Sequence, residues 1–170
     1  MMFNLDEEIV KTLTGRISQF LGNDLLGTSV SADIPEFILK SARIVDLLKF
    51  LHDEPDLDFC FLTTLCGVHY PETDTFAVVY HLHSFKNNIR IRLKINIPVD
   101  KPEVMTATSV FSAANWMERE TYDFYGIVFT GHPELKRILN VDEMDYFPLR
   151  KEYPLEDGTR EDKDDKMFGR

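Results

Sequence analysis

Hydrophobic residues recur every three or four positions in two stretches of the N-terminal third of the chain. The first stretch, from Asn4 to Gly22, has apolar positions at Ile9, Leu13, Ile17 and Phe20. The second stretch begins near Ser41, ends before Pro55 and has apolar positions at Ile44, Leu47, Leu48 and Leu51. A period of about 3.6 residues is typical of a helix with one buried face. The pattern predicts two amphipathic helices that lie on a common surface.

That surface is predicted by the stretches that follow. Residues 58–68 form a mostly apolar run, residues 75–85 form another, and residues 89–97 alternate between apolar and polar side chains. Such patterns are typical of strands, and residues 86–88 supply a turn between the last two. Residues 26–38 are predicted as an extended segment broken by Pro35, and residues 103–110 as an edge strand. The predicted fold is α+β, a two-layer sandwich with helices on a mixed, mostly antiparallel sheet and an extended C-terminal arm.

A third helix is predicted at residues 112–125, because Ser112 is a suitable N-cap and Gly126 a natural stop. Its core-facing positions at helical spacing are Ala113, Met117, Thr121 and Phe124. Arg119 and Asp123 are four residues apart and can pair. The remaining positions are predicted to face outward: Glu118, Glu120, Tyr122 and Tyr125. An isolated surface ion pair contributes only ~0.5 kcal/mol, so docking or site chemistry explains this charged and aromatic cluster better than stability does.

Periodicity fades after the third helix. A short helical turn is predicted at residues 135–139, and little regular pattern follows Asn140. The last residues, from Glu152 onward, are rich in both acids and bases and contain few large apolar side chains, so they cannot fold alone. We therefore predict an α+β domain at residues 1–139, including the helix at 112–125, and an extended arm at residues 140–170.

Composition narrows the classes of partner. The 170 residues carry a net charge of −10 and are 44% hydrophobic, which argues against nucleic acid or an anionic membrane surface and favours proteins as partners. No run approaches the ~18 apolar residues of a membrane span, and the N-terminus lacks the basic and apolar regions of a signal peptide. We expect no direct membrane insertion. Cys60 and Cys66 form no C-x-x-C pair, so the chain offers no cysteine cluster for iron–sulfur or zinc.

Two groups of residues are candidates for metal or acid–base chemistry. Glu118, Glu120 and Asp123 are spaced for one helix, but Arg119 lies among them and no nucleophile or phosphate loop accompanies them. His81 and His83 share one face of a strand, although no spacing points to a third ligand. A stand-alone metal-dependent enzyme built from these residues is kept as an alternative. An interface role is preferred.

The basic residues after the third helix support the interface interpretation. Arg150 and Lys151 can meet carboxylates of a partner, since a guanidinium pairs with them in a directional, bidentate way. Arginine and aromatic residues are also the usual anchors of protein interfaces. The predicted partner interface consists of Trp116, Glu118, Arg119, Glu120, Asp123, His132, Arg137, Arg150 and Lys151. No catalytic, cofactor-binding or metal-binding residue is predicted.

Three motif blocks carry a resemblance to a known family. They read W-x-E-R-E-x-x-D-x-x-G-I from Trp116, F-x-G-H-P-x-L-x-R-I-L from Phe129, and P-L-R-K-x-x-P from Pro148. In this order and spacing they resemble the C subunit of respiratory complex I, which is the 30-kDa subunit family. The resemblance extends upstream to Leu62 and includes the run G-V-H-Y-P, in which His69 stands where the family usually has Asp.

The resemblance implies a cofactor-free, non-catalytic subunit of a proton-translocating NADH:quinone oxidoreductase. FMN and iron–sulfur clusters would be carried by partner subunits, and this chain would hold the quinone-reducing module, mainly its D subunit, in position. The implied location is peripheral, at the cytoplasmic face of the bacterial inner membrane. The alternative of this class is the equivalent subunit of a related membrane-bound hydrogenase or of another quinone- or ferredoxin-linked dehydrogenase.

Overall fold

A computed structural model of the chain describes residues 7–153. The two predicted N-terminal helices are present as α1 (Glu7–Leu21) and α2 (Ile44–Asp53). The start predicted for the first helix, at Asn4, lies outside the described residues. Most of the apolar positions predicted for the two helices are buried: Leu13, Ile17, Ile44, Leu47, Leu48 and Leu51, with Leu21 in addition. Phe20 is only partly buried and Ile9 is 38% exposed, so the prediction fails at Ile9.

The main sheet has five strands in the order β1-β2-β5-β4-β3. Their bounds are β1 (Leu25–Ser31), β2 (Ile34–Leu39), β3 (Phe61–Tyr70), β4 (Thr75–Ser84) and β5 (Ile89–Pro98). The pair β2–β5 is parallel and the other neighbours are antiparallel. Single-turn 3-10 helices occur at η1 (Gly22–Asp24), η2 (Ser41–Arg43) and η3 (Pro71–Thr73).

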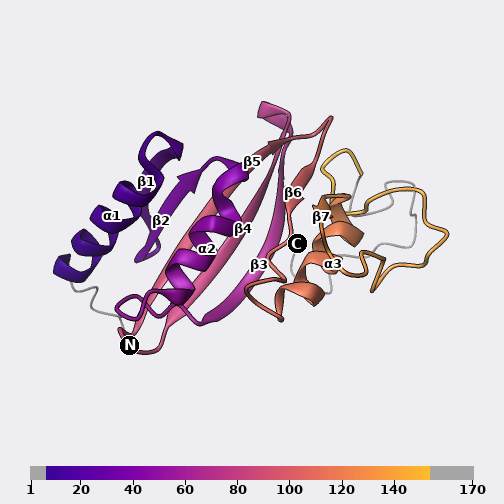
Figure 1. The fold of residues 1–170 in the computed structure, drawn as a ribbon. Coiled ribbons are helices and arrows are strands. Elements are labelled where there is room, and N and C mark those ends of the chain that lie inside the picture. Colours follow the sequence, from indigo (N-terminus) through magenta and orange to yellow (C-terminus); the bar gives the residue numbers. More distant parts are fainter. Residues whose placement is uncertain (1–6, 154–170) are drawn as a thin grey trace, which may run out of the picture.

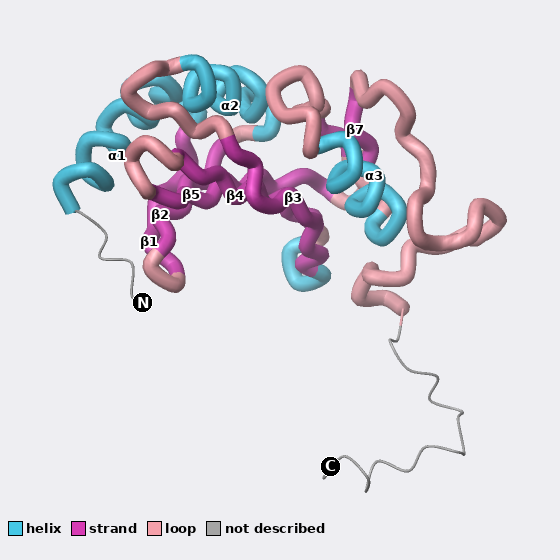
Figure 2. The backbone as a smooth tube through the Cα atoms, turned by 90° about the horizontal axis from the view of Figure 1, so that it is seen from below, coloured by secondary structure: helices cyan, strands magenta, loops and turns pink. Residues whose placement is uncertain are grey.

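Helices α1 and α2 lie together on one face of this sheet (Figures 1 and 2). The alternation in β5 fits this arrangement, because its apolar side chains are buried toward the helices: Ile89, Ile91, Leu93, Ile95 and Ile97. On the opposite, open face, Arg92 pairs with Glu36 of β2 across the parallel strands. The predicted α+β class and the mixed, mostly antiparallel sheet under helices are confirmed.

Two strand predictions were wrong in detail. The extended segment at residues 26–38 is broken at Ala32 and Asp33 and not at Pro35, which pairs with Val30 within the sheet. Strands β1 and β2 form an antiparallel hairpin whose turn residues Ala32 and Asp33 have φ of 51° and 61°. The strand predicted at residues 103–110 is short and does not join the main sheet. Instead β6 (Glu103–Met105) pairs in parallel with β7 (Val128–Thr130) in a separate small sheet.

The third helix, α3 (Ala114–Tyr125), packs against β3 at the other end of the sheet (Figure 1). Gly67 of β3 permits this contact, since a Cβ there would lie 2.8 Å from the Tyr125 ring. The helical turn predicted at residues 135–139 is absent, and residues 131–153 contain only turns and bends. Residues 140–153 nevertheless return to the domain, where the Leu149 N–H donates to the Phe124 carbonyl. The rest of the predicted arm, residues 154–170, lies outside the described part of the chain.

Candidate functional site

Helix α3 organises the motif residues. It begins two residues later than predicted, because a turn precedes it and Ala113, not Ser112, is the N-cap, without a side-chain hydrogen bond. Its end is as expected at Gly126, which adopts the left-handed conformation with φ of 75°. A Cβ at Gly126 would also lie 2.6 Å from the Phe147 ring. The glycine therefore ends the helix and admits the C-terminal segment close to it.

Glu118 faces the interior, so its predicted outward orientation was wrong. Its exposed fraction is 0%, and its carboxylate accepts the Thr106 hydroxyl at 2.6 Å and the Ala107 N–H at 2.6 Å. Burial raises the pKa of Glu118 to about 7, against the opposing effect of the two hydrogen bonds. The carboxylate thus fixes the loop between β6 and α3.

Asp123 is also fully buried and anchors the segment after β7. Its carboxylate accepts the backbone N–H groups of Ile138, Leu139 and Asn140, as well as the Asn140 side chain and the Arg137 guanidinium at 2.8 Å. Burial alone would raise the pKa of this carboxyl, but the donors outweigh it and hold the pKa well below its usual range. The cationic partner of Asp123 is therefore Arg137 and not the predicted Arg119.

Arg137 extends this anchor along the chain. Besides the Asp123 carboxylate, its guanidinium donates to the carbonyls of Asp123, Met144 and Tyr146. It also lies over the Phe147 ring, 5.1 Å from the centroid. One planar side chain with several donors can hold several acceptors in a fixed geometry. Arg137 therefore ties residues 144–147 to the end of α3.

The exposed end of the motif lies at the start of α3. The Arg119 side chain is nearly buried and donates to the carbonyls of Lys136 and Arg137. Trp116 lies over this guanidinium at 5.1 Å and is 62% exposed, and Glu120 is exposed as well. Of the charged residues predicted to face a partner from this helix, Glu120 is the one whose side chain is exposed.

The imidazole of His132 joins the next loop to α3. Its Nε2 lies 3.1 Å from the Asn115 carbonyl, and its Nδ1 accepts the Glu134 N–H at 3.0 Å. These two bonds require the neutral tautomer with the proton on Nε2. His132 therefore supports the conformation of the loop that follows β7.

Arg150 and His69 fasten the last described residues. The Arg150 guanidinium lies between the rings of Phe76 and Phe147, at 5.2 Å and 4.7 Å, and donates to the Tyr125 carbonyl. Lys151 has an exposed side chain, and its backbone N–H donates to His69 Nδ1 at 3.0 Å. His69 acts here as a hydrogen-bond acceptor, a role that an aspartate can also fill.

The comparisons with known proteins agree with the motifs. Residues 37–159 match the family described as "Respiratory-chain NADH dehydrogenase, 30 Kd subunit". The chain belongs to this family. It is 47% identical to the C 2 subunit of NADH-quinone oxidoreductase from Rhizobium etli (strain CIAT 652), over 76% of this chain and 68% of that protein. It is 43% identical to the C subunit of NADH-quinone oxidoreductase from Roseiflexus sp. (strain RS-1), over 85% of this chain and 83% of that one.

Solved structures share the fold of this 30-kDa subunit family member. A trypsin-resistant fragment of Nqo5 superposes with a TM-score of 0.60 at 26% identity, covering 72% of this chain and 98% of the fragment. A chain of an archaeal membrane-bound sulfane sulfur reductase superposes with a TM-score of 0.71 at 24% identity, covering 85% of each chain. The latter likeness concerns the fold alone.

His81 of the candidate metal pair is already hydrogen-bonded within the sheet. His81 Nε2 accepts the Arg92 Nε–H at 2.8 Å, and burial lowers the pKa of His81. Glu118 and Asp123 are each engaged by different loops, as described above. Within residues 7–153, no group of three His, Cys, Asp or Glu side chains is placed to hold a metal ion.

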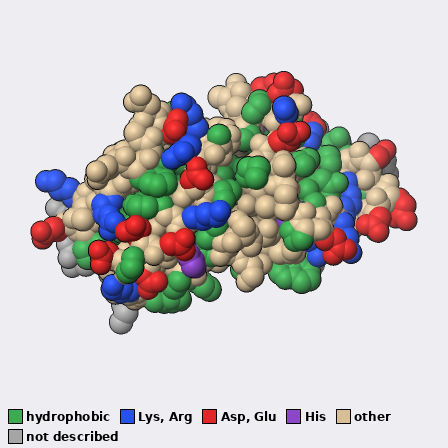
Figure 3. All heavy atoms as spheres, viewed as in Figure 1, with side chains coloured by type: hydrophobic (Ala, Val, Ile, Leu, Met, Phe, Trp, Pro, Cys, Tyr) green, Lys and Arg blue, Asp and Glu red, His purple; other side chains and the backbone are tan. Residues whose placement is uncertain are grey.

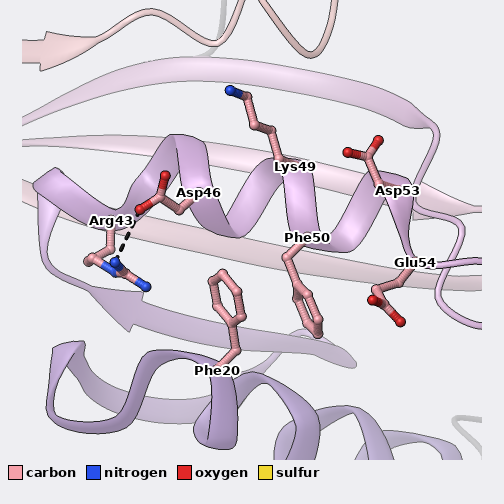
Figure 4. A pocket seen from close by; sticks show the side chains of 7 residues that line it. All are labelled: Phe20, Arg43, Asp46, Lys49, Phe50, Asp53 and Glu54. Atoms are coloured by element: carbon pink, nitrogen blue, oxygen red, sulfur yellow. Dashed lines mark ion pairs between the residues drawn. The ribbon is translucent and has the colours of Figure 1, made fainter.

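A shallow depression between α1 and α2 is lined by side chains of both helices, among them Phe20 and Phe50 (Figure 4). It measures about 330 Å³, and the Phe20 and Phe50 rings stack in it at 4.3 Å. Arg16 lies over Phe50 and Arg43 over Phe20, which continues the stack on both sides. These contacts join the two helices. Among the described residues, no helix is long and apolar enough to cross a bilayer.

The sequence did not reveal the residues that make hydrogen bonds or ring contacts with the motif side chains and the segments they hold. They are Thr106, Asn140, Phe147 and the acceptor His69. A buried acid needs donors, and the polar T-A-T run at residues 106–108 and the L-N pair at 139–140 contain such groups. Their pairing with α3 depends on tertiary contacts 11 to 17 residues apart.

Proposed function

We propose that this chain is the C subunit of an NADH:quinone oxidoreductase, in which it is a cofactor-free, non-catalytic docking subunit of the peripheral arm. Its family membership across residues 37–159 and its two named relatives support this assignment. In this role it supports assembly and positions the quinone-reducing module, mainly the D subunit, during electron transfer from NADH to quinone coupled to proton translocation. FMN and iron–sulfur clusters lie on partner subunits. The complex is placed at the bacterial inner membrane, with this subunit peripheral on the cytoplasmic face.

The docking role is supported by the hydrogen bonds that the motif's polar side chains make within the chain itself. Glu118, Arg119, Asp123 and Arg137 are all bonded to the chain itself, and they hold the loops around α3 in place. The large side chains left exposed on α3 and on the held segment form what we call the C-terminal surface: Trp116 62%, Leu139 65%, Val141 63%, Tyr146 39% and Tyr153 37%. A surface fixed before binding loses less conformational freedom on association.

The chemistry of the C-terminal surface suits a protein partner. Figure 3 shows hydrophobic side chains next to acidic and basic ones over the right-hand part of the molecule, where α3 and the following segment lie. Aromatic anchors with a charged surround are typical of protein interfaces. Glu120 and the Lys151 ammonium remain exposed beside these anchors and can pair with charges of the partner. The contribution of such rim charges is to orientation and association rate more than to affinity.

The test is affinity purification of the tagged chain from gently solubilised membranes, with identification of the subunits that accompany it. We expect quinone-module subunits with the native chain and their loss with the double variant Leu139→Asp and Val141→Asp, which inserts charges into an apolar contact. Phe85→Asp is the matched control, because Phe85 is 62% exposed but lies at the far end of β4.

Each outcome decides between the candidate functions. Normal co-purification with the double variant would contradict docking through the C-terminal surface. A nickel-bearing large subunit among the partners would support the hydrogenase alternative in place of NADH:quinone oxidoreductase. Turnover of a substrate by the purified chain alone would overturn the non-catalytic role.

A further inference from the structure

A cavity of about 320 Å³ lies beside the N-terminal half of α1. Helix α1 forms one wall, and the other walls are formed by Asp56, Leu57 and Phe59 after α2 and by Asn87 and Ile89 near the start of β5. An apolar cavity of about 150 Å³ can take up a benzene molecule, so this one has room for at least one large apolar side chain.

The floor of this cavity is apolar. The buried core residues that line it are Leu13, Leu57, Phe59 and Ile89. Two polar side chains at the rim are already engaged by neighbours. The Arg16 guanidinium pairs with Glu54 at 2.7 Å, and the Asn87 amide donates to the carbonyls of Asp56 and Leu57 at 2.8 Å and 3.1 Å. The cavity therefore suits an apolar occupant better than a polar one.

The cavity lies along the apolar stripe of α1. Ile9, Leu13 and Ile17 follow one another at intervals of four residues, yet Ile9 is 38% exposed while the other two are buried. The residues of α1 that line the cavity occupy positions 8, 9, 12, 13 and 16, which is the spacing of one helical face. The same spacing, carried one turn toward the N-terminus, reaches Leu5.

We infer that the segment directly before α1, residues 1–6, covers this cavity and places the Leu5 side chain in it. The segment reads M-M-F-N-L-D, so its chemistry is mostly apolar and matches the floor of the cavity. Leu5 contacts the core residues of the floor, and Ile9 beside it is removed from water. Burial of a leucine side chain on apolar neighbours stabilises the fold at this end of the domain.

The covalent connection to α1 favours this segment over any other occupant. Leu5 is two residues from Glu7, where α1 begins, and two residues span at most about 7 Å. A group held this close has an effective concentration on the order of millimolar, whereas a separate protein must find the cavity from solution. The inference depends neither on the C-terminal surface nor on the proposed function.

Thiol reactivity tests whether Leu5 covers the cavity. Ile9→Cys places a thiol beside the cavity, and the native Cys60, which is exposed, is the internal reference for alkylation by iodoacetamide. In the full chain we expect this thiol to react about tenfold faster when Leu5→Asn is added, because a polar amide does not enter an apolar cavity. Adding Leu5→Met should keep the slow rate. Equal rates in all three proteins would overturn the inference, as would protection that arises only in the intact complex, where another subunit would be the cover.

Urea unfolding of the same substitutions, made in the native chain, tests the contact energetically. Leu5→Asn should raise the equilibrium constant for unfolding about tenfold or more, since the burial of one leucine side chain is lost. Leu5→Met keeps an apolar side chain of similar volume and should stay close to the native chain. Equal stability of Leu5→Asn and the native chain would overturn the inference. Both variants leave the C-terminal surface intact, so the result is independent of the Leu139 and Val141 test.

Discussion

The substitution Glu118→Gln should remove a pH dependence of folding that the buried carboxylate creates. The pKa of Glu118 is raised from 4.5 to about 7, so the folded state keeps a proton that the unfolded state has already lost. The contribution of Glu118 to stability is therefore fully present below about pH 4.5 and is lost as the pH rises to about 7. At about 1.4 kcal/mol per pKa unit, the free energy of unfolding falls by about 3 kcal/mol across this window.

A glutamine side chain at position 118 can keep both contacts without ionising. Its carbonyl oxygen can accept the Ala107 N–H, and its amide can donate to the Thr106 hydroxyl oxygen, the two groups that now lie 2.6 Å from the carboxylate. We expect the variant to match the native chain near pH 5 and to be more stable by about 2 to 3 kcal/mol at pH 8. The Tyr80 ring, fully buried in the core, is itself influenced by the Glu118 charge, so its environment should also respond.

The assay is urea unfolding of both proteins at several pH values between 5 and 8. The difference between their free energies of unfolding cancels the other ionisable groups, and Glu120→Gln is the matched control because Glu120 is exposed on the same helix. We expect the control to differ from the native chain by no more than about 0.5 kcal/mol. A pH-independent difference for Glu118→Gln, or a less stable variant at pH 8, would show that the carboxylate is stably ionised and refute the reasoning.

Three further predictions concern the contacts around α3. Asp123→Asn should lower the free energy of unfolding by about 3 to 5 kcal/mol, because it leaves the nearly buried Arg137 guanidinium without its charged partner. In the native chain, the stability that Asp123 contributes should be lost only at strongly acid pH, where its lowered pKa is reached. An unchanged urea midpoint in the variant would contradict this. Gly67→Ala should cost about 1 to 3 kcal/mol in thermal unfolding, because its Cβ meets a ring of α3 at 2.8 Å. Gly15→Ala, in open space within α1, should instead stabilise the protein by up to about 1 kcal/mol. His69→Asp should preserve and His69→Phe should lose the protection of the Lys151 amide in hydrogen exchange, and equal protection in both would exclude the acceptor role.

Much of the fold follows from periodicity in the sequence. The stripes of α1 and α2 and the alternation of β5 predicted which side chains are buried, because a sheet covered on one face by helices imposes a period of 3.6 or 2 on its contacts. The β1–β2 hairpin was missed because its turn, Ala32-Asp33, lacks the Asn-Gly or Asp-Gly signal usual where both residues have positive φ. The short pair β6–β7 joins strands of three residues each, too short to show alternation.

The contacts of α3 were harder to predict than the helix itself. Helical periodicity placed Glu118 on the solvent side and paired Asp123 with Arg119, and both predictions fail because the two carboxylates are buried with donors from loops that sequence spacing cannot place beside them. The outward position predicted for Glu120 is confirmed, since its side chain is exposed. Burial of a polar side chain depends on the donors that tertiary structure brings to it.

Under the proposed docking role, the two buried acids of α3 would act on recognition without touching a partner. Glu118 accepts a hydrogen bond from the loop before the helix, and Asp123 accepts hydrogen bonds from the segment after it. Helix α3 therefore holds both flanking segments in place. Because these bonds are internal, losing one would loosen the C-terminal surface and weaken docking even though every exposed contact residue remained. Assembly defects in Asp123→Asn should therefore be rescued by conditions that stabilise the fold, whereas those in the Leu139 and Val141 variant should not. That difference separates a residue that shapes a binding surface from one that belongs to it.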